Sequence, residues 1–201
     1  TMDMDVDFVR YSISDAAIER FVKKLNSLEG VTISIRGRIA ELKHQEYRGK
    51  RIYLTVRDTV GGEAVTKVDI GVHTRAEVRQ KDFVFDVVTE RRGVKLLANS
   101  KEQIFVEKLK SMLKIGAFSG RYKDVFDMYF LMDKLSKRTL RAYVKMYIFD
   151  DKKMRERDGD AVVSRVKAVL AQKSYVAGLR NKKFAWIDTD PREVVSGLVK
   201  F

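Results

Sequence analysis

The chain has no cysteine among its 201 residues, only two histidines and a single proline. The absence of cysteine excludes disulfide bonds and thiolate metal sites, and it favours an intracellular, cytoplasmic protein. His44 and His73 are too few for a histidine-rich metal centre, so any bound metal would be held mainly by carboxylates. No apolar run approaches the roughly 20 residues that a membrane-spanning helix needs, so we expect no membrane partner.

Acidic residues are in the minority, since 41 Lys and Arg face 28 Asp and Glu and give a formal net charge of +13. A surplus of this size favours a polyanionic partner such as nucleic acid, because phosphates attract lysine and arginine. The alternative is a basic surface that only keeps the protein soluble. With 45% hydrophobic and 34% charged residues, the chain has the composition of a globular protein with a sizeable core.

The hydrophobic pattern changes near Asn99, and the part before it predicts an α+β core. A strand is expected over Asp3–Val9 and a helix from Ser14 to Ser27. Further strands are expected at Thr32–Leu42, Arg51–Val56, Thr66–Val72, Asp82–Thr89 and Val94–Leu97. The last two strands should form a hairpin whose turn lies at Arg91–Gly93. This order indicates a mixed sheet packed on one or two helices.

The part after Asn99 has helical periodicity and predicts a helical domain. Ser100 followed by Gln103 predicts a capping box that starts a helix ending near Lys114. The other expected helices are Tyr122–Lys134, Lys137–Phe149, Asp160–Gln172 and Pro191–Val199. Lys152–Asp158 is a charge-dense link between two of these helices, which we expect to be a long mobile tip.

Asp3 and Asp5 stand two residues apart in an alternating strand, so their side chains share one face with backbones roughly 6–7 Å apart. Two carboxylates so placed can converge on divalent cations, which prefer oxygen ligands. Asp69, on a strand expected to lie beside the first, could complete a trio suited to in-line phosphoryl or nucleotidyl transfer with two metal ions. The alternative is a solvated acidic edge strand, since Asp7 continues the same alternation and Asp69 could simply pair with Lys67.

Lys108 lies on the apolar stripe of its expected helix, whose solvated side is predicted to carry Gln103 and Lys110. A lysine on such a stripe needs an anionic partner or ligand, because burying it alone is costly. Asp124 and Asp127 interrupt a mostly apolar helix at i, i+3 spacing and are neighbours on its surface. Two interpretations remain open: a structural Lys–Asp pairing between helices, or a lysine that binds nucleotide phosphate and is oriented by the two aspartates.

Four segments in this order resemble the AbiEii/AbiGii toxin family of nucleotidyltransferases, which belongs to the DNA-polymerase-β-like nucleotidyltransferase superfamily. The segments are TMDMD, KVDIG, VEKLKSM and RYKDVFDMYFL. Family members carry an Asp-x-Asp on a strand, a third acid on a later strand, a Glu-Lys-Leu-type helix and a Lys/Arg-Asp-x-x-Asp helix. The resemblance runs from Thr1 to about Asp133. It implies a nucleotidyltransferase-like mixed sheet with flanking helices over residues 1–99 and a helical domain over residues 100–201.

The resemblance also implies roles for two groups of residues. The catalytic carboxylates, which would bind Mg²⁺ or Mn²⁺, would be Asp3, Asp5 and Asp69. The nucleotide-binding residues, facing them across a cleft between the two domains, would be Lys108, Asp124 and Asp127.

The implied function is a metal-dependent transferase that moves a nucleotide from an NTP to an acceptor, for which RNA such as tRNA is the candidate. It would be the toxin of a bacterial toxin–antitoxin or abortive-infection system, with a cognate antitoxin as partner. The family places a Gly-Ser or Gly-Gly turn shortly before the Asp-x-Asp to hold the triphosphate, and here nothing precedes Thr1. Two alternatives therefore stay open: a truncated or inactive homologue that binds nucleic acid or protein, and a metal-dependent nuclease with the same carboxylates.

Overall fold

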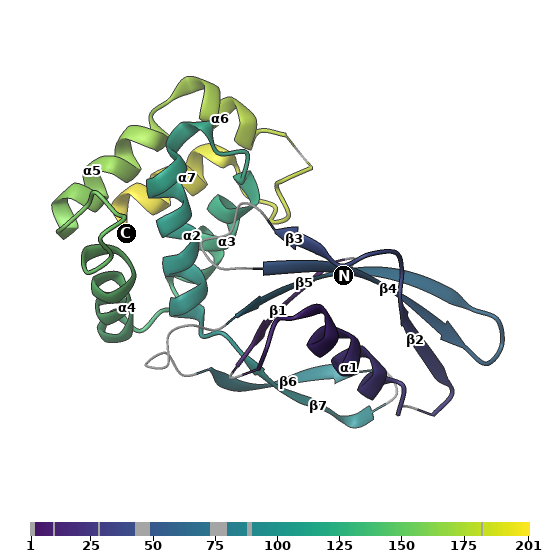
Figure 1. Cartoon of the computed structure of the whole chain (residues 1–201). Helices are drawn as coiled ribbons and strands as arrows, with labels where there is room; N and C mark the ends of the chain where they lie inside the picture. Colours follow the sequence, from purple (N-terminus) through teal and green to yellow (C-terminus); the bar gives the residue numbers. More distant parts are fainter. Residues whose placement is uncertain are drawn as a thin grey trace. The chain divides into compact units, whose positions relative to one another are not determined.

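The structure is a computed structural model, and it describes the chain except residues 1–2, 10, 28, 43–48, 73–79, 88–89 and 182. The side chains of residues 3, 85–87 and 90–94 are also outside the description. The chain divides into two compact units, Thr1–Glu77 and Val78–Phe201 (Figure 1). Strands dominate the first unit and helices the second, so the predicted α+β class is confirmed.

The first unit is a mixed sheet with helix α1 packed on one face. Its elements are β1 (Asp3–Phe8), α1 (Asp15–Leu25), β2 (Val31–Ile35), β3 (Ala40–Leu42), β4 (Gly49–Asp58) and β5 (Glu63–Val72). The strand order is β1-β5-β4-β2, and β3 also pairs with β4. β1 runs parallel to β5, whereas the pairings of β4 with β2, β3 and β5 are antiparallel.

Helix α1 packs on one face of this sheet, and this distinguishes the two faces. The Ser14 hydroxyl caps its first turn by accepting a hydrogen bond from the Ala17 N–H at 3.3 Å. Buried Ile18 and Val22 then pack against strand residues such as Val68, which alternate toward the helix. Because successive strand residues point to opposite faces, the residues between these apolar ones project from the face opposite α1.

The predicted strand Thr32–Leu42 is wrong in one respect, because it is two strands rather than one. β2 and β3 each pair with β4 and are separated by Gly37. Gly37 has a φ of 75°, a left-handed conformation that breaks the extended chain and that glycine adopts without steric cost. The predicted hairpin turn at Arg91–Gly93 is also misplaced, since these residues belong to a strand and Val87 already pairs with Glu90.

The second unit begins with a two-stranded hairpin and continues as a helical bundle. The hairpin strands are β6 (Lys81–Val87) and β7 (Glu90–Ala98). The helices are α2 (Lys101–Ile115), a 3₁₀ turn at Gly116–Phe118, α3 (Tyr122–Met132), α4 (Lys137–Val144) with a π-helical turn at Lys145–Phe149, α5 (Gly159–Leu170), α6 (Lys173–Leu179) and α7 (Pro191–Lys200). Helix α6 was not predicted, since its seven residues span too few turns to give a clear period.

Two polar residues of α2 are buried, contrary to the solvated side predicted for this helix. Gln103 is 1% exposed and Lys110 is 6% exposed. The Lys110 ammonium donates a hydrogen bond to the Asp151 carboxylate at 2.7 Å, so its charge is paired inside the bundle. Periodicity alone cannot reveal this, because the partner lies 41 residues away in the sequence.

The charge-dense segment Lys152–Asp158 is packed against the bundle, so the predicted long tip is wrong. Met154 and Glu156 are buried. The Arg157 guanidinium donates to the backbone carbonyls of Phe149 and Asp151 at 2.8 and 2.9 Å. These hydrogen bonds fold the segment back onto the end of the preceding helix.

The ring of Tyr122 lies against α6 at Gly178, where a β-carbon would overlap it. Tyr122 also contacts the rings of Tyr175 and Phe184, with centroids 5.3 and 5.2 Å apart. The close approach of α3 and α6 at this point therefore depends on the absence of a side chain at residue 178.

Gly178→Ala should lower the free energy of unfolding by about 1–3 kcal/mol, the usual cost of an overpacked core. This loss should appear even though alanine is roughly 1 kcal/mol more favourable than glycine inside a helix. Gly159→Ala is the control, because no atom lies within 4 Å of the β-carbon there. Chemical denaturation of both variants measures the difference, and equal stability of the two would contradict this packing.

Candidate active site

Asp5 and Asp69 lie opposite each other on the parallel strands β1 and β5. The register pairs Asp5 with Asp69 and places Asp3 opposite Lys67. Paired residues on neighbouring strands project to the same face. Since Val68 packs under α1, Asp5 and Asp69 project from the face opposite this helix. The backbone of Asp3 follows the same alternation, but its side chain lies outside the described part.

Arg51 on β4 holds the carboxylate of Asp69. The two residues are cross-strand partners, and the guanidinium donates from Nε to Oδ1 at 2.7 Å and from Nη2 to Oδ2 at 2.8 Å. The Asp69 side chain is 14% exposed and that of Arg51 is 36% exposed. The hydrogen bonds from Arg51 outweigh burial and lower the pKa of Asp69. Asp69 is therefore an oriented, ionised carboxylate at neutral pH.

Lys108 on α2 bridges Asp124 and Asp127 on α3. Its Nζ lies 2.7 Å from Asp124 Oδ1 and 2.8 Å from Asp127 Oδ2. Burial on its own would lower the pKa of Lys108, but hydrogen bonds to the two carboxylates prevail and raise it. The lysine therefore stays charged, and one ammonium group serves two aspartates.

The second oxygen of Asp124 is an exception within this cluster. Oδ2 is buried, and within the described residues it has no hydrogen-bond partner. The Nη1 of Arg121 lies 3.8 Å from this oxygen, beyond hydrogen-bond distance. Burial and the charge of Asp124 also raise the pKa of neighbouring Tyr175 to about 12. This oxygen is an acceptor that the described residues leave unused, and its burial shields it from solvent.

Trp186 completes the cluster from the segment between α6 and α7. Its Nε1 donates a hydrogen bond to Asp127 Oδ1 at 2.7 Å. Asp127 thus holds Lys108 with one oxygen and Trp186 with the other.

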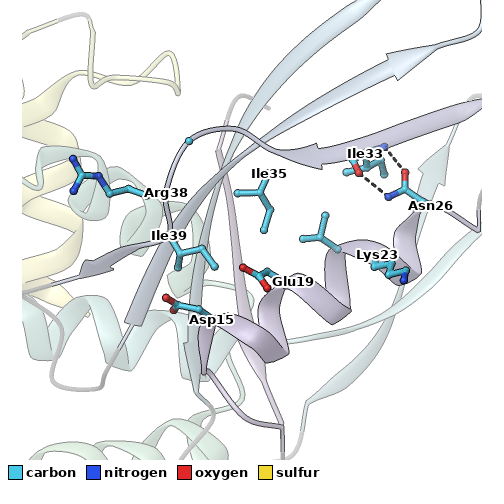
Figure 2. A pocket seen from close by; sticks show the side chains of 10 residues that line it. Asp15, Glu19, Lys23, Asn26, Ile33, Ile35, Arg38 and Ile39 are labelled. Atoms are coloured by element: carbon cyan, nitrogen blue, oxygen red, sulfur yellow. Dashed lines mark hydrogen bonds between the residues drawn. The ribbon is translucent and has the colours of Figure 1, made fainter.

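A cavity of about 680 Å³ opens in the first unit between α1 and β2. Asp15 and Glu19 of the helix and Ile33 and Ile35 of the strand line it, and the Asn26 amide fixes its far end through two hydrogen bonds with the Ile33 backbone (Figure 2). The cavity is on the helix-covered face of the sheet. It is therefore separate from the face that carries the predicted carboxylates.

Comparison with protein families gives one assignment. The family model described as nucleotidyl transferase AbiEii toxin, type IV toxin–antitoxin system, matches residues 1–187. The chain belongs to the AbiEii family. The resemblance predicted from four motifs is thereby confirmed, and the match continues beyond Asp133 to include α6 and Trp186. A comparison with curated proteins gives no match.

The donors on the sheet suit the divalent metal that nucleotidyltransferases such as those of the AbiEii family usually employ. Asp5 is exposed, and Asp7 lies farther along the same face with its carboxylate over Gly71. A carboxylate has about four lone-pair positions, and the Arg51 fork uses two of those on Asp69. Asp69 can therefore ligate a cation while it stays paired. No three metal-binding side chains converge within the described residues, so the full trio with Asp3 stays a prediction.

Sequence reasoning about this AbiEii-family chain missed Arg51 and Trp186. Arg51 lies opposite Asp69 only in the observed register, in which Arg57 pairs with Glu63. A two-residue turn at Gly61–Gly62 would place Leu54 there instead, so the sequence carries no clear signal for Arg51. Trp186 lies in an irregular segment, where no periodicity indicates its neighbours. Among the described helices, none is long and apolar enough to cross a membrane.

Proposed function

We propose that this chain is a metal-dependent nucleotidyltransferase of the AbiEii toxin type, which transfers a nucleotide from an NTP to RNA such as tRNA. The observation that carries the proposal is the cross-strand pair of Asp5 and Asp69 in a chain that matches the family over residues 1–187. The net charge of +13 supports an RNA acceptor, because lysine and arginine bind its phosphates.

In this proposal Asp5 and Asp69, together with Asp3, hold Mg²⁺ or Mn²⁺. Bound metal ions stabilise the charge on the attacking and leaving oxygens of an in-line transfer. Arg51 fixes the direction of the Asp69 carboxylate and keeps it ionised. Its role is one of positioning.

Lys108 supplies the positive charge for the phosphates of the NTP. Asp124 and Asp127 hold its ammonium group in place. The two groups of residues belong to different units, so their action on one nucleotide stays a prediction.

The type IV toxin–antitoxin family further supports a partner protein. We propose that this chain is the toxin, that a cognate antitoxin restrains it, and that the pair serves in abortive infection. Since its proposed substrates are NTP and RNA, the activity would be cytoplasmic.

The proposal predicts that RNA becomes labelled when the chain is incubated with Mg²⁺, bulk tRNA and an NTP carrying a labelled α-phosphate. The label should be absent with γ-labelled NTP, because nucleotidyl transfer releases the β- and γ-phosphates as pyrophosphate. Chelation of the metal should stop the reaction.

Other outcomes of the same assay identify the alternatives. RNA that is shortened without added NTP would indicate a metal-dependent nuclease. Salt-sensitive RNA binding without either reaction would indicate a binding module. Either result would overturn the transferase proposal.

A further inference from the structure

Two large aromatic side chains meet at the surface of the second unit beside the Lys108 cluster. Trp186 is 50% exposed and Phe130 of α3 is 45% exposed. Their ring centroids are 5.1 Å apart with an interplanar angle of 64°, which is an edge-to-face contact. About half of each side chain remains exposed to solvent in this contact. Each ring therefore presents apolar surface that a ligand could cover.

The indole ring of Trp186 is held in a fixed orientation. Its N–H donates to Asp127 Oδ1 at 2.7 Å, and the other Asp127 oxygen is bound by Lys108 at 2.8 Å. The ring is thus oriented by the same carboxylate that positions the proposed phosphate-binding lysine. Pre-organised groups bind ligands more tightly, because less conformational freedom is lost on binding.

Two exposed lysines flank these rings along α3 and the turn after it. Lys123, Asp127 and Phe130 follow one another at spacings of four and three residues along one side of α3, and Lys134 lies in the turn just beyond the end of the helix. The Lys134 ammonium lies over one face of the Phe130 ring, 3.0 Å from its centroid, so a base that stacks on this ring would use the opposite face or displace the ammonium. Aromatic rings with cations beside them are the combination by which proteins bind unpaired nucleotides: the base stacks, and the phosphate meets the cation.

We propose that Trp186 and Phe130 form a stacking site for a nucleobase, whose attached phosphates are contacted by Lys123 and Lys134. The inference rests on the proposed function, since the base would belong either to the NTP or to an unpaired end of the acceptor RNA. The site should accept all four bases, because each base offers an aromatic face. It assigns a role to Trp186, which none of the predicted motifs includes.

The chain contains a single tryptophan, so fluorescence excited at a wavelength that tyrosine does not absorb reports on Trp186 alone. We expect saturable quenching when the full chain is titrated, without Mg²⁺, with an NTP or with a short unpaired RNA oligonucleotide. Quenching by the NTP assigns the base to the nucleotide substrate, and quenching by the oligonucleotide alone assigns it to the acceptor. No quenching by either probe would overturn the proposal.

Variants of Phe130 test the stacking itself. Phe130→Ala and Phe130→Leu should each lower the affinity for the quenching probe by about 5- to 150-fold, the contribution of stacking on one aromatic side chain. The leucine variant keeps an apolar side chain of similar size, so its loss isolates the aromatic face and guards against a folding defect. Phe118→Ala is the control, because Phe118 is 98% exposed in the same unit and its removal should not change affinity.

These measurements separate the stacking site from the transferase activity. Binding is measured without metal and without turnover, so a chain that transfers no nucleotide would still show the quenching and the Phe130 effects. If the unsubstituted chain labels RNA normally but both Phe130 variants keep full affinity for the probe, the proposed function stands and the stacking site is rejected.

Discussion

Replacing Asp5 by alanine or Asp69 by asparagine should lower nucleotide transfer by more than about 100-fold, since even outer partners of metal ligands contribute roughly 10- to 100-fold. Asp5 and Asp69 face each other across β1 and β5 and are proposed to share the cation. Asparagine keeps the size of Asp69 and one acceptor for Arg51 but removes the negative charge. The rate of label incorporation, measured over a range of Mg²⁺ concentrations, tests both variants.

Glu63→Gln provides a matched control on the same strand. Glu63 projects from the same face of β5 as Asp69, and it accepts a hydrogen bond at 2.8 Å from its own cross-strand partner, Arg57. This exposed pair should contribute at most about 1 kcal/mol to stability. Glu63→Gln should therefore leave the transfer rate unchanged. If Asp69→Asn behaved the same way, Asp69 would be only the structural partner of Arg51.

Lys108→Ala should abolish nucleotide binding and also lower the free energy of unfolding by roughly 3 kcal/mol, the lower end for breaking a buried ion pair. The loss should lie at this end because the Lys108 side chain is 23% exposed. Without the ammonium, Asp124 and Asp127 would face each other with no cation between them.

A second substitution separates the two roles of Lys108. Adding Asp127→Asn to Lys108→Ala removes one of the two repelling charges, so stability should recover in part while nucleotide affinity stays lost. If affinity returned together with stability, the lysine would be only structural. Lys110→Ala is the control on the same helix: it breaks the buried pair with Asp151 and should lower stability without changing nucleotide affinity. Calorimetric titration with NTP and chemical denaturation measure the two quantities.

Much of the fold follows from local patterns in the sequence. The alternation in β1 and β5 and the Ser14 cap of α1 are properties of short segments, and the sequence predicts them correctly. The division of Thr32–Leu42 at Gly37 and the burial of Lys110 were not predicted. Both depend on which strand or helix packs against the segment. A partner that is distant in the chain does not change the local hydrophobic periodicity, so the sequence pattern does not reveal it.

The same distinction applies to the candidate site. The spacing of Asp3 and Asp5 and the polar interruptions on α3 single out these aspartates without any structure. The roles of Arg51 and Trp186, in contrast, can be recognised from their hydrogen bonds to Asp69 and Asp127, which the sequence does not show. Charged and aromatic side chains are common on protein surfaces, so their identity alone does not distinguish a positioning residue from a solvated one.

The proposed carboxylate site is complete only after the strand that carries Asp5 has docked. β5 pairs with β4 across the short connection of residues 59–62, whereas its pairing with β1 closes a much longer loop. Since short loops close at lower entropic cost, the hairpin with its Arg51–Asp69 pair should form first during folding. β1 would arrive later, at the edge of a sheet already built. A cation bound between Asp5 and Asp69 would then favour the docked strand, so the proposed catalytic metal would also stabilise the last step of folding.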